Sequence, residues 1–143
     1  MKNLISCFLL ASITLFFSCS HKSIEVSDPD IFKDYIVSYT NGLVSSESDV
    51  RTVLNFDNLE WQPNQELSSD LFSISPKVSG KVIAINSNTL AFVPSKKLDQ
   101  DTEYHISFHL DELKDVPKEQ RTFVFKIKTL KQNTTISKKV KLL

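Results

Sequence analysis

Apolar and polar residues alternate along most of the chain from residue 35 onward. Between residues 102 and 110 the apolar residues take every second position: Tyr104, Ile106, Phe108 and Leu110. Successive side chains of a β-strand point to opposite faces, so a period of two is typical of a strand with one buried and one polar face. This pattern predicts seven strands, at residues 36–41, 50–56, 71–75, 79–86, 89–93, 102–110 and 121–129.

Turn-forming residues separate the predicted strands, namely Asn41-Gly42, Gln62-Pro63-Asn64, Ser75-Pro76, Asn86-Ser87-Asn88, Pro94-Ser95 and Val116-Pro117. Seven short strands with turns at such intervals are typical of an immunoglobulin-like sandwich, in which two sheets close over one core. Of the ten phenylalanines in the sequence, six lie within residues 35–130 and can fill that core. We therefore expect an all-β fold, a seven-stranded immunoglobulin-like sandwich over residues 35–130.

The length and charge of the chain narrow its functional classes. A sequence of 143 residues fits one domain. The formal net charge is zero, so no basic excess favours nucleic acid as a partner. The two glycines, Gly42 and Gly80, cannot form the glycine-rich loop that cradles a nucleotide phosphate. We expect no nucleic-acid partner and no cofactor.

The chain begins with the features of an export signal. Lys2 precedes an apolar run at residues 4–17. A helix of that length would span about 21 Å, less than the roughly 30 Å of a bilayer's hydrocarbon core. Short apolar runs behind a positive charge are typical of signal peptides rather than of membrane-spanning anchors.

The end of this run, Phe16-Phe17-Ser18-Cys19, resembles a bacterial lipobox, although the common lipobox carries leucine where Phe16 stands. The resemblance implies a lipoprotein signal peptide at residues 1–18 and attachment of fatty acids such as palmitate to Cys19. With Ser20 next to the cysteine, it also implies a lipid anchor in the cell envelope, at the outer membrane, on the periplasmic face or the cell surface. The alternative is an ordinary secretory signal that ends near a cysteine.

Cysteine usage agrees with acylation of Cys19. Cys7 would leave with the signal peptide, so Cys19 would be the only cysteine of the mature chain. The mature chain could then form neither an internal disulfide nor a thiolate metal site.

Two polar segments flank the predicted sandwich. We expect residues 19–34 to form a tether, either extended or with one helical turn that begins at Asp28 and Pro29. Residues 131–143 contain four lysines and no acidic residue. This basic tail either contacts anionic lipid headgroups or is a solvated terminus.

Few residues are candidates for chemistry. His105 and His109 would be about 13 Å apart on a strand, too far to share a metal ion, so we expect them to face solvent and predict no metal site and no catalytic residue. Trp61 lies in a loop between Glu60 and Gln62. Its ring either stacks against a sugar or peptide ligand or covers the end of the sandwich. The spacing of Leu98 and Tyr104 predicts a tyrosine corner, whose hydroxyl bonds an upstream backbone group.

Three sequence motifs are similar to those of a known family: Phe72-Ser73-Ile74-Ser75-Pro76, Leu90-Ala91-Phe92-Val93-Pro94, and Leu98 followed by Tyr104. Together they resemble the bacterial Ig-like domain near the N-terminus of alpha-2-macroglobulin-family lipoproteins of the Bacteroidota type. The family's thioester motif, Cys-x-Glu-Gln, has no match here, because Lys118-Glu119-Gln120 lacks the cysteine. The chain therefore resembles a truncated, membrane-proximal first domain, and proteinase trapping is not implied.

The resemblance implies a lipid-anchored, non-catalytic module that acts as a spacer or docking domain. Its partners would be the membrane, through Cys19, and other macroglobulin-like domains or an envelope protein. The alternative is a stand-alone surface module that binds a glycan or a host protein, with Trp61 as its stacking residue.

Overall fold

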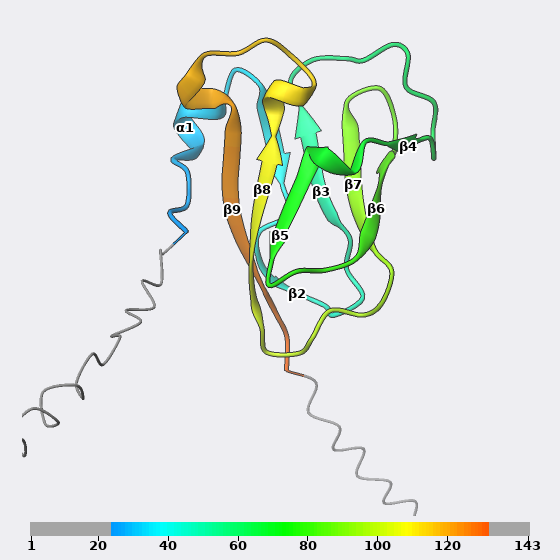
Figure 1. The fold of residues 1–143 in the computed structure, drawn as a ribbon, viewed down its shortest axis with the longest axis vertical. Coiled ribbons are helices and arrows are strands. Elements are labelled where there is room, and N and C mark those ends of the chain that lie inside the picture. The colour runs from blue at the N-terminus through cyan, green and yellow to red at the C-terminus, as the bar shows by residue number, and fades with distance from the viewer. Residues whose placement is uncertain (1–23, 132–143) are drawn as a thin grey trace, which may run out of the picture.

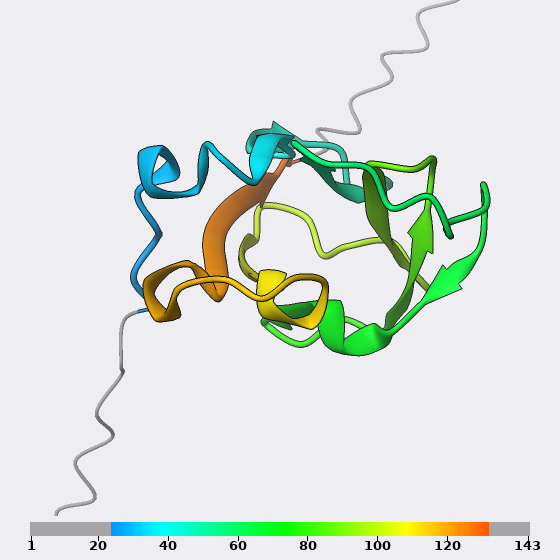
Figure 2. The ribbon, with the colours of Figure 1, turned by 90° about the horizontal axis from the view of Figure 1, so that it is seen from above.

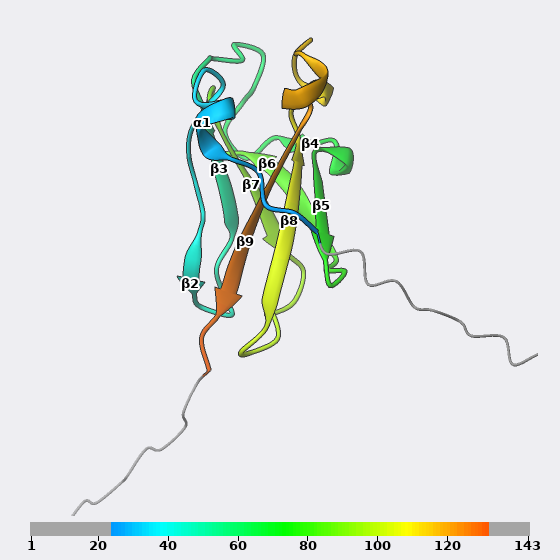
Figure 3. The same ribbon diagram turned by 90° about the vertical axis from the view of Figure 1, so that its left-hand side faces the viewer.

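A computed structural model describes residues 24–131, which form two β-sheets packed face to face (Figure 1). One sheet has the strand order β1-β3-β7-β6-β4 and the other the order β2-β9-β8-β5. Figure 3 shows the two layers from the side. The strands within this range are β1 (Ile36–Tyr39), β2 (Gly42–Val44), β3 (Val50–Leu54), β4 (Glu66–Leu67), β5 (Phe72–Ser75), β6 (Gly80–Ala84), β7 (Thr89–Pro94), β8 (Glu103–His109) and β9 (Thr122–Thr129).

The strand order is that of an immunoglobulin-type sandwich. In that fold strands A, B, E and D form one sheet and strands C, F and G the other. Here β1, β3, β7 and β6 take the first set of places, and β5, β8 and β9 take the second. β2 continues from β1, but it joins the other sheet and lies parallel to β9. The structure confirms the all-β, immunoglobulin-like sandwich that the sequence predicts.

The structure has nine strands in the described range, where the sequence predicts seven. Each predicted range overlaps an observed strand, and the two additional strands are β2 and β4. Gly42 has a φ of +71°, a conformation that glycine adopts without the steric cost of a Cβ, and it directs the chain from one sheet to the other. The sequence prediction read Asn41-Gly42 as a simple turn, and it therefore missed β2. β4 has only two residues, which is too short for a recognisable alternation.

Phenylalanine dominates the core, as expected from the composition. Phe108, Phe123 and Phe125 project from the four-stranded sheet and are fully buried. The ring of Phe123 lies 4.9 Å from that of Phe32 and 4.8 Å from that of Tyr39, centroid to centroid. Such tilted and edge-on pairs add about 0.5–1.5 kcal/mol each beyond the burial of their surface.

Of the predicted tether at residues 19–34, the part from Ser27 onward packs against the folded domain, and residues 19–23 lie outside the described residues. The Ser27 amide donates to the Val124 carbonyl at 2.8 Å, and the Ser27 hydroxyl accepts from the Val124 amide at 2.9 Å. Helix α1 (Pro29–Phe32) follows, with the Asp28 side chain as its N-cap, and places Phe32 in the core with 2% of its surface exposed. The helical-turn alternative is thus confirmed. This helical turn holds the N-terminal segment on the domain because Phe32 packs into the core.

α1 is also joined to the turn that precedes β9. Three short 3-10 turns lie outside the sheets: η1 (Ser69–Leu71), η2 (Leu110–Glu112) and η3 (Lys118–Gln120). The Gln120 side chain donates from Nε2 to the Ile31 carbonyl at 2.7 Å. Figure 2 shows α1 at one edge of the sandwich, on the same side as β9. A single core therefore includes the N-terminal segment from Ser27 onward.

Several predictions concern residues that the structure does not describe. They are the signal peptide at residues 1–18, acylation of Cys19 and the basic tail beyond Lys131. Within residues 24–131, no helix has the length and apolar character that a membrane crossing requires.

Candidate functional site

The tyrosine corner is present and organises the loop between β7 and β8. Tyr104 is buried at the start of β8, and its hydroxyl accepts a hydrogen bond from the Asp99 amide at 3.0 Å. Thr129 holds the same loop from β9, because its Oγ1 donates to the Asp99 carbonyl at 2.5 Å and accepts from the Thr102 amide at 2.9 Å. The loop at residues 95–102 is therefore fixed from inside, which confirms a structural role for Tyr104.

A cleft of about 240 Å³ lies between this loop and the loop from β5 to β6. The Ser95 amide donates to the Ser79 carbonyl at 2.8 Å and joins the two loops. Both loops lie at the lower end of the domain in Figure 1, where the described chain ends. The cleft is lined by Lys77, Val78, Ser79, Ser95, Lys96, Lys97, Leu98, Asp99 and Tyr104.

The cleft has more basic than acidic side chains. Lys77 and Lys96 are exposed and, in the part of the chain that the structure describes, neither forms an ion pair. Lys97 forms an ion pair with Glu47. The hydrogen bond and the positive charge of Lys97 lower the pKa of the Glu47 carboxyl below its ordinary value. Asp99 is the one acidic residue among the described residues that line this cleft. The arrangement suits an anionic ligand.

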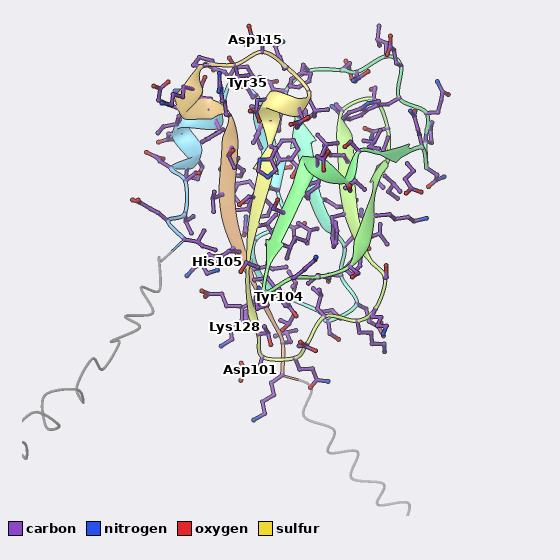
Figure 4. All side chains as sticks on the ribbon, in the orientation of Figure 1. Tyr35, Asp101, Tyr104, His105, Asp115 and Lys128 are labelled. Carbon is purple, nitrogen blue, oxygen red and sulfur yellow. The ribbon has the colours of Figure 1, made fainter. Side chains whose placement is uncertain are left out.

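The two histidines lie on the outer face of the four-stranded sheet, as the alternation predicts, although they are half-buried rather than fully exposed. His105 Nε2 is 3.7 Å from a carboxylate oxygen of Glu103, and Lys126 lies 3.3 Å from the other oxygen. Figure 4 labels His105 beside the lower half of β8 and β9. No group of three His, Cys, Asp or Glu side chains within residues 24–131 is placed to hold a metal ion.

His109 belongs to a network of side chains across the same sheet. Its Nε2 is 3.0 Å from the Ser73 hydroxyl, and its Nδ1 is 3.4 Å from the Thr122 hydroxyl. A histidine that activates a serine nucleophile is usually oriented by a third group, most often a carboxylate, and needs a nearby oxyanion site. Here the second ring nitrogen faces the Thr122 hydroxyl rather than a carboxylate. The three side chains link β5, β8 and β9.

Trp61 is buried, with 9% of its surface exposed, and belongs to the hydrophobic core. Its backbone amide donates to the Asn58 carbonyl at 3.1 Å, and this turn directs the indole inward while Leu59 remains 85% exposed. An indole in this position has no open face for a sugar or a peptide. Of the two roles left open for Trp61, its burial supports packing at the end of the sandwich, and a stacking role for Trp61 in glycan binding has no support.

The sequence prediction overlooked the cleft, although its signals were present. Pro76-Lys77 and Ser95-Lys96-Lys97 each follow a predicted strand end. Strands C and E of an immunoglobulin sandwich end on the same side of the molecule, so lysines that follow them lie near one another. Lone lysines in turns are so common that the pairing becomes visible only once the strand order is known.

Comparison with known proteins gives a similarity of fold. No family model matches the sequence, and no curated protein matches it. L,D-transpeptidase 3 from Mycobacterium tuberculosis is similar at 10% identity and a TM-score of 0.47, over 67% of this chain and 37% of that chain. An L,D-transpeptidase from M. tuberculosis H37Rv is similar at 10% identity and a TM-score of 0.45, over 67% and 40% of the two chains. This chain thus spans about two fifths of the length of those enzymes.

Proposed function

We propose that this chain is a lipid-anchored, non-catalytic immunoglobulin-like module of the bacterial cell envelope. Acylated Cys19 holds it at the outer membrane, where it docks other macroglobulin-like domains or an envelope protein. The lipobox-like residues Phe16 to Cys19 support the anchor, and the resemblance of residues 72–104 to the first domain of macroglobulin-like lipoproteins supports the docking role.

The observation that carries this proposal is the pair of hydrogen bonds between Ser27 and Val124 of β9, because Ser27 follows Cys19 by only eight residues. The chain from Cys19 to Ser27 can extend at most about 27 Å, whereas a tether running to residue 34 would extend about 50 Å. The domain is therefore held close to the bilayer that the anchor enters. A docking module at the membrane surface fits this reach better than a long spacer.

Mass spectrometry of the exported protein tests the anchor directly. We expect a mature chain that begins at Cys19 and carries several fatty acyl chains, because two or more such chains give stable membrane attachment. Cys19→Ala should move the protein from the membrane to the soluble fraction.

Cys7→Ala is the matched control, since it removes the other cysteine and should leave fractionation unchanged. An unacylated mature N-terminus at another residue, or membrane retention of Cys19→Ala equal to that of the wild type, would refute the anchor.

A further inference from the structure

The two ends of the sandwich differ in charge. The end formed by α1 and the turns around β9 is rich in acidic side chains: Asp28, Asp30, Asp34, Asp111, Glu112 and Asp115. The opposite end holds the cleft between the β5–β6 and β7–β8 loops, with Lys77, Lys96 and Lys97, and the described chain finishes there at Lys131. Figure 4 labels Asp115 at the first end and Lys128 near the second. Each end also carries side chains of the other sign, Lys33 and Lys118 at the first and Asp101 and Glu103 at the second, so attraction of an anion depends on the local arrangement of the cleft.

From this cleft we infer a second function: it binds a phosphate group. Lys77 and Lys96 come from two different loops and line the same cleft of about 240 Å³. Their ammonium groups lack a carboxylate partner among residues 24–131, so binding an anion breaks no existing ion pair. Lysine is a common phosphate ligand because its ammonium group is a compact charge with three donors.

Two serines also line the cleft. Ser79 and Ser95 both line it, and the hydrogen bond between their backbones keeps the two loops in place. Tyr104 and Thr129 fix the second loop through Asp99. The lysines are therefore carried on loops whose backbone is already ordered, which lowers the entropic cost of binding.

The negative charge of Asp99 should weaken the binding of an anion. Removing that charge should therefore raise the affinity, whereas removing the lysines should lower it. The backbone amide and carbonyl of Asp99 hold the tyrosine corner, and Asp99 is also one of the residues that line the cleft. Asp99→Asn keeps the shape of the side chain and the backbone contacts but removes the negative charge. Phosphate should therefore bind more tightly to Asp99→Asn than to the wild type.

The phosphate could belong to a phospholipid headgroup or to a free phosphate ester. The headgroup source rests on the proposed anchoring, which holds the domain near a bilayer. The phosphate site itself does not, because every residue that forms it lies within residues 77–104.

The first experiment uses the mature full-length protein in a neutral detergent. Its unfolding temperature is measured at pH 7 against increasing inorganic phosphate, with chloride at matched ionic strength as the reference. A ligand that binds only the folded state raises the unfolding temperature in a saturable manner. We expect saturation with the wild type, and an affinity at least about tenfold lower for the double variant K77Q/K96Q, since a charged hydrogen bond contributes enough for such a change.

The matched control is K33Q/K118Q, which removes two exposed lysines at the acidic end and should bind phosphate like the wild type. Both double variants should unfold at the wild-type temperature without phosphate. A wild type that shows no saturable response overturns the proposal, as does an equal response from K77Q/K96Q or a weaker response from Asp99→Asn.

A second arm distinguishes the source of the phosphate. Short-chain phosphatidylglycerol and glycerol phosphate are each added below micelle-forming concentrations, and their affinities are compared. Tighter binding of the lipid identifies a headgroup site, and tighter binding of the free ester identifies a soluble ligand. Binding of neither, at concentrations where phosphate saturates, contradicts the site. The phosphate measurements do not depend on whether Cys19 is acylated. The lipid anchor and the phosphate site can therefore each be refuted without the other.

Discussion

Tyr104 illustrates how a single hydroxyl can hold a loop. The ring is buried, and its oxygen is the acceptor for the Asp99 amide on the adjoining loop. The same loop forms one wall of the lysine-lined cleft, so the stability of the fold and the geometry of the cleft depend on the same contact.

We predict that Tyr104→Phe lowers the free energy of unfolding by about 1–3 kcal/mol, because the partly buried Asp99 amide is left without its acceptor. Chemical denaturation followed by tryptophan fluorescence measures the change. Tyr35→Phe is the control, since the hydroxyl of half-buried Tyr35 makes no hydrogen bond within the described residues. Equal losses in the two variants would show that the hydroxyl of Tyr104 has no special role.

Thr52 is the opposite case, a buried hydroxyl without a partner. It lies on β3 with none of its surface exposed, and its Oγ1 has no hydrogen bond within residues 24–131. We predict that Thr52→Val raises the free energy of unfolding by about 1 kcal/mol, because the isopropyl group fills nearly the same shape without an unsatisfied polar atom. The thermal midpoint should increase accordingly.

Thr129→Val gives the matched comparison for Thr52→Val. Thr129 is also buried, but its hydroxyl bonds the Asp99 carbonyl, so this variant should be less stable than the wild type. A loss of stability in both variants would contradict the prediction for Thr52.

At the scale of elements, the sequence predicted what depends on local alternation. β8 alternates buried positions with half-buried or exposed ones over its whole length, and its range was predicted to within one residue at each end. β2 and β4 were missed because one starts at a glycine read as a turn and the other has two residues. Their existence depends on pairing with β9 and β6, which lie far away in the sequence.

The candidate site shows the same difference between features set by nearby residues and features set by contacts between separate segments. The tyrosine corner was predictable because Leu98 and Tyr104 are close in sequence. The cleft was not, because it requires lysines from two loops that only the strand order brings together. Trp61 was ambiguous for a related reason: its burial is decided by the direction of the turn at Asn58.

At the scale of the molecule, one core extends from α1 to β9, and this has a consequence for unfolding. Phe32 would be exposed on a tether, yet here it packs against Phe123 of the last strand. We predict that Phe32→Ala destabilises the whole domain by about 3–5 kcal/mol in a single cooperative transition, because the cavity opens in the core that both sheets share. Circular dichroism and tryptophan fluorescence should report the same lowered midpoint. Ile31→Ala, at the exposed neighbouring position, should change the midpoint little. An unchanged midpoint for Phe32→Ala, or an early separate transition that leaves the sheets folded, would show that the N-terminal segment is not part of the cooperative core.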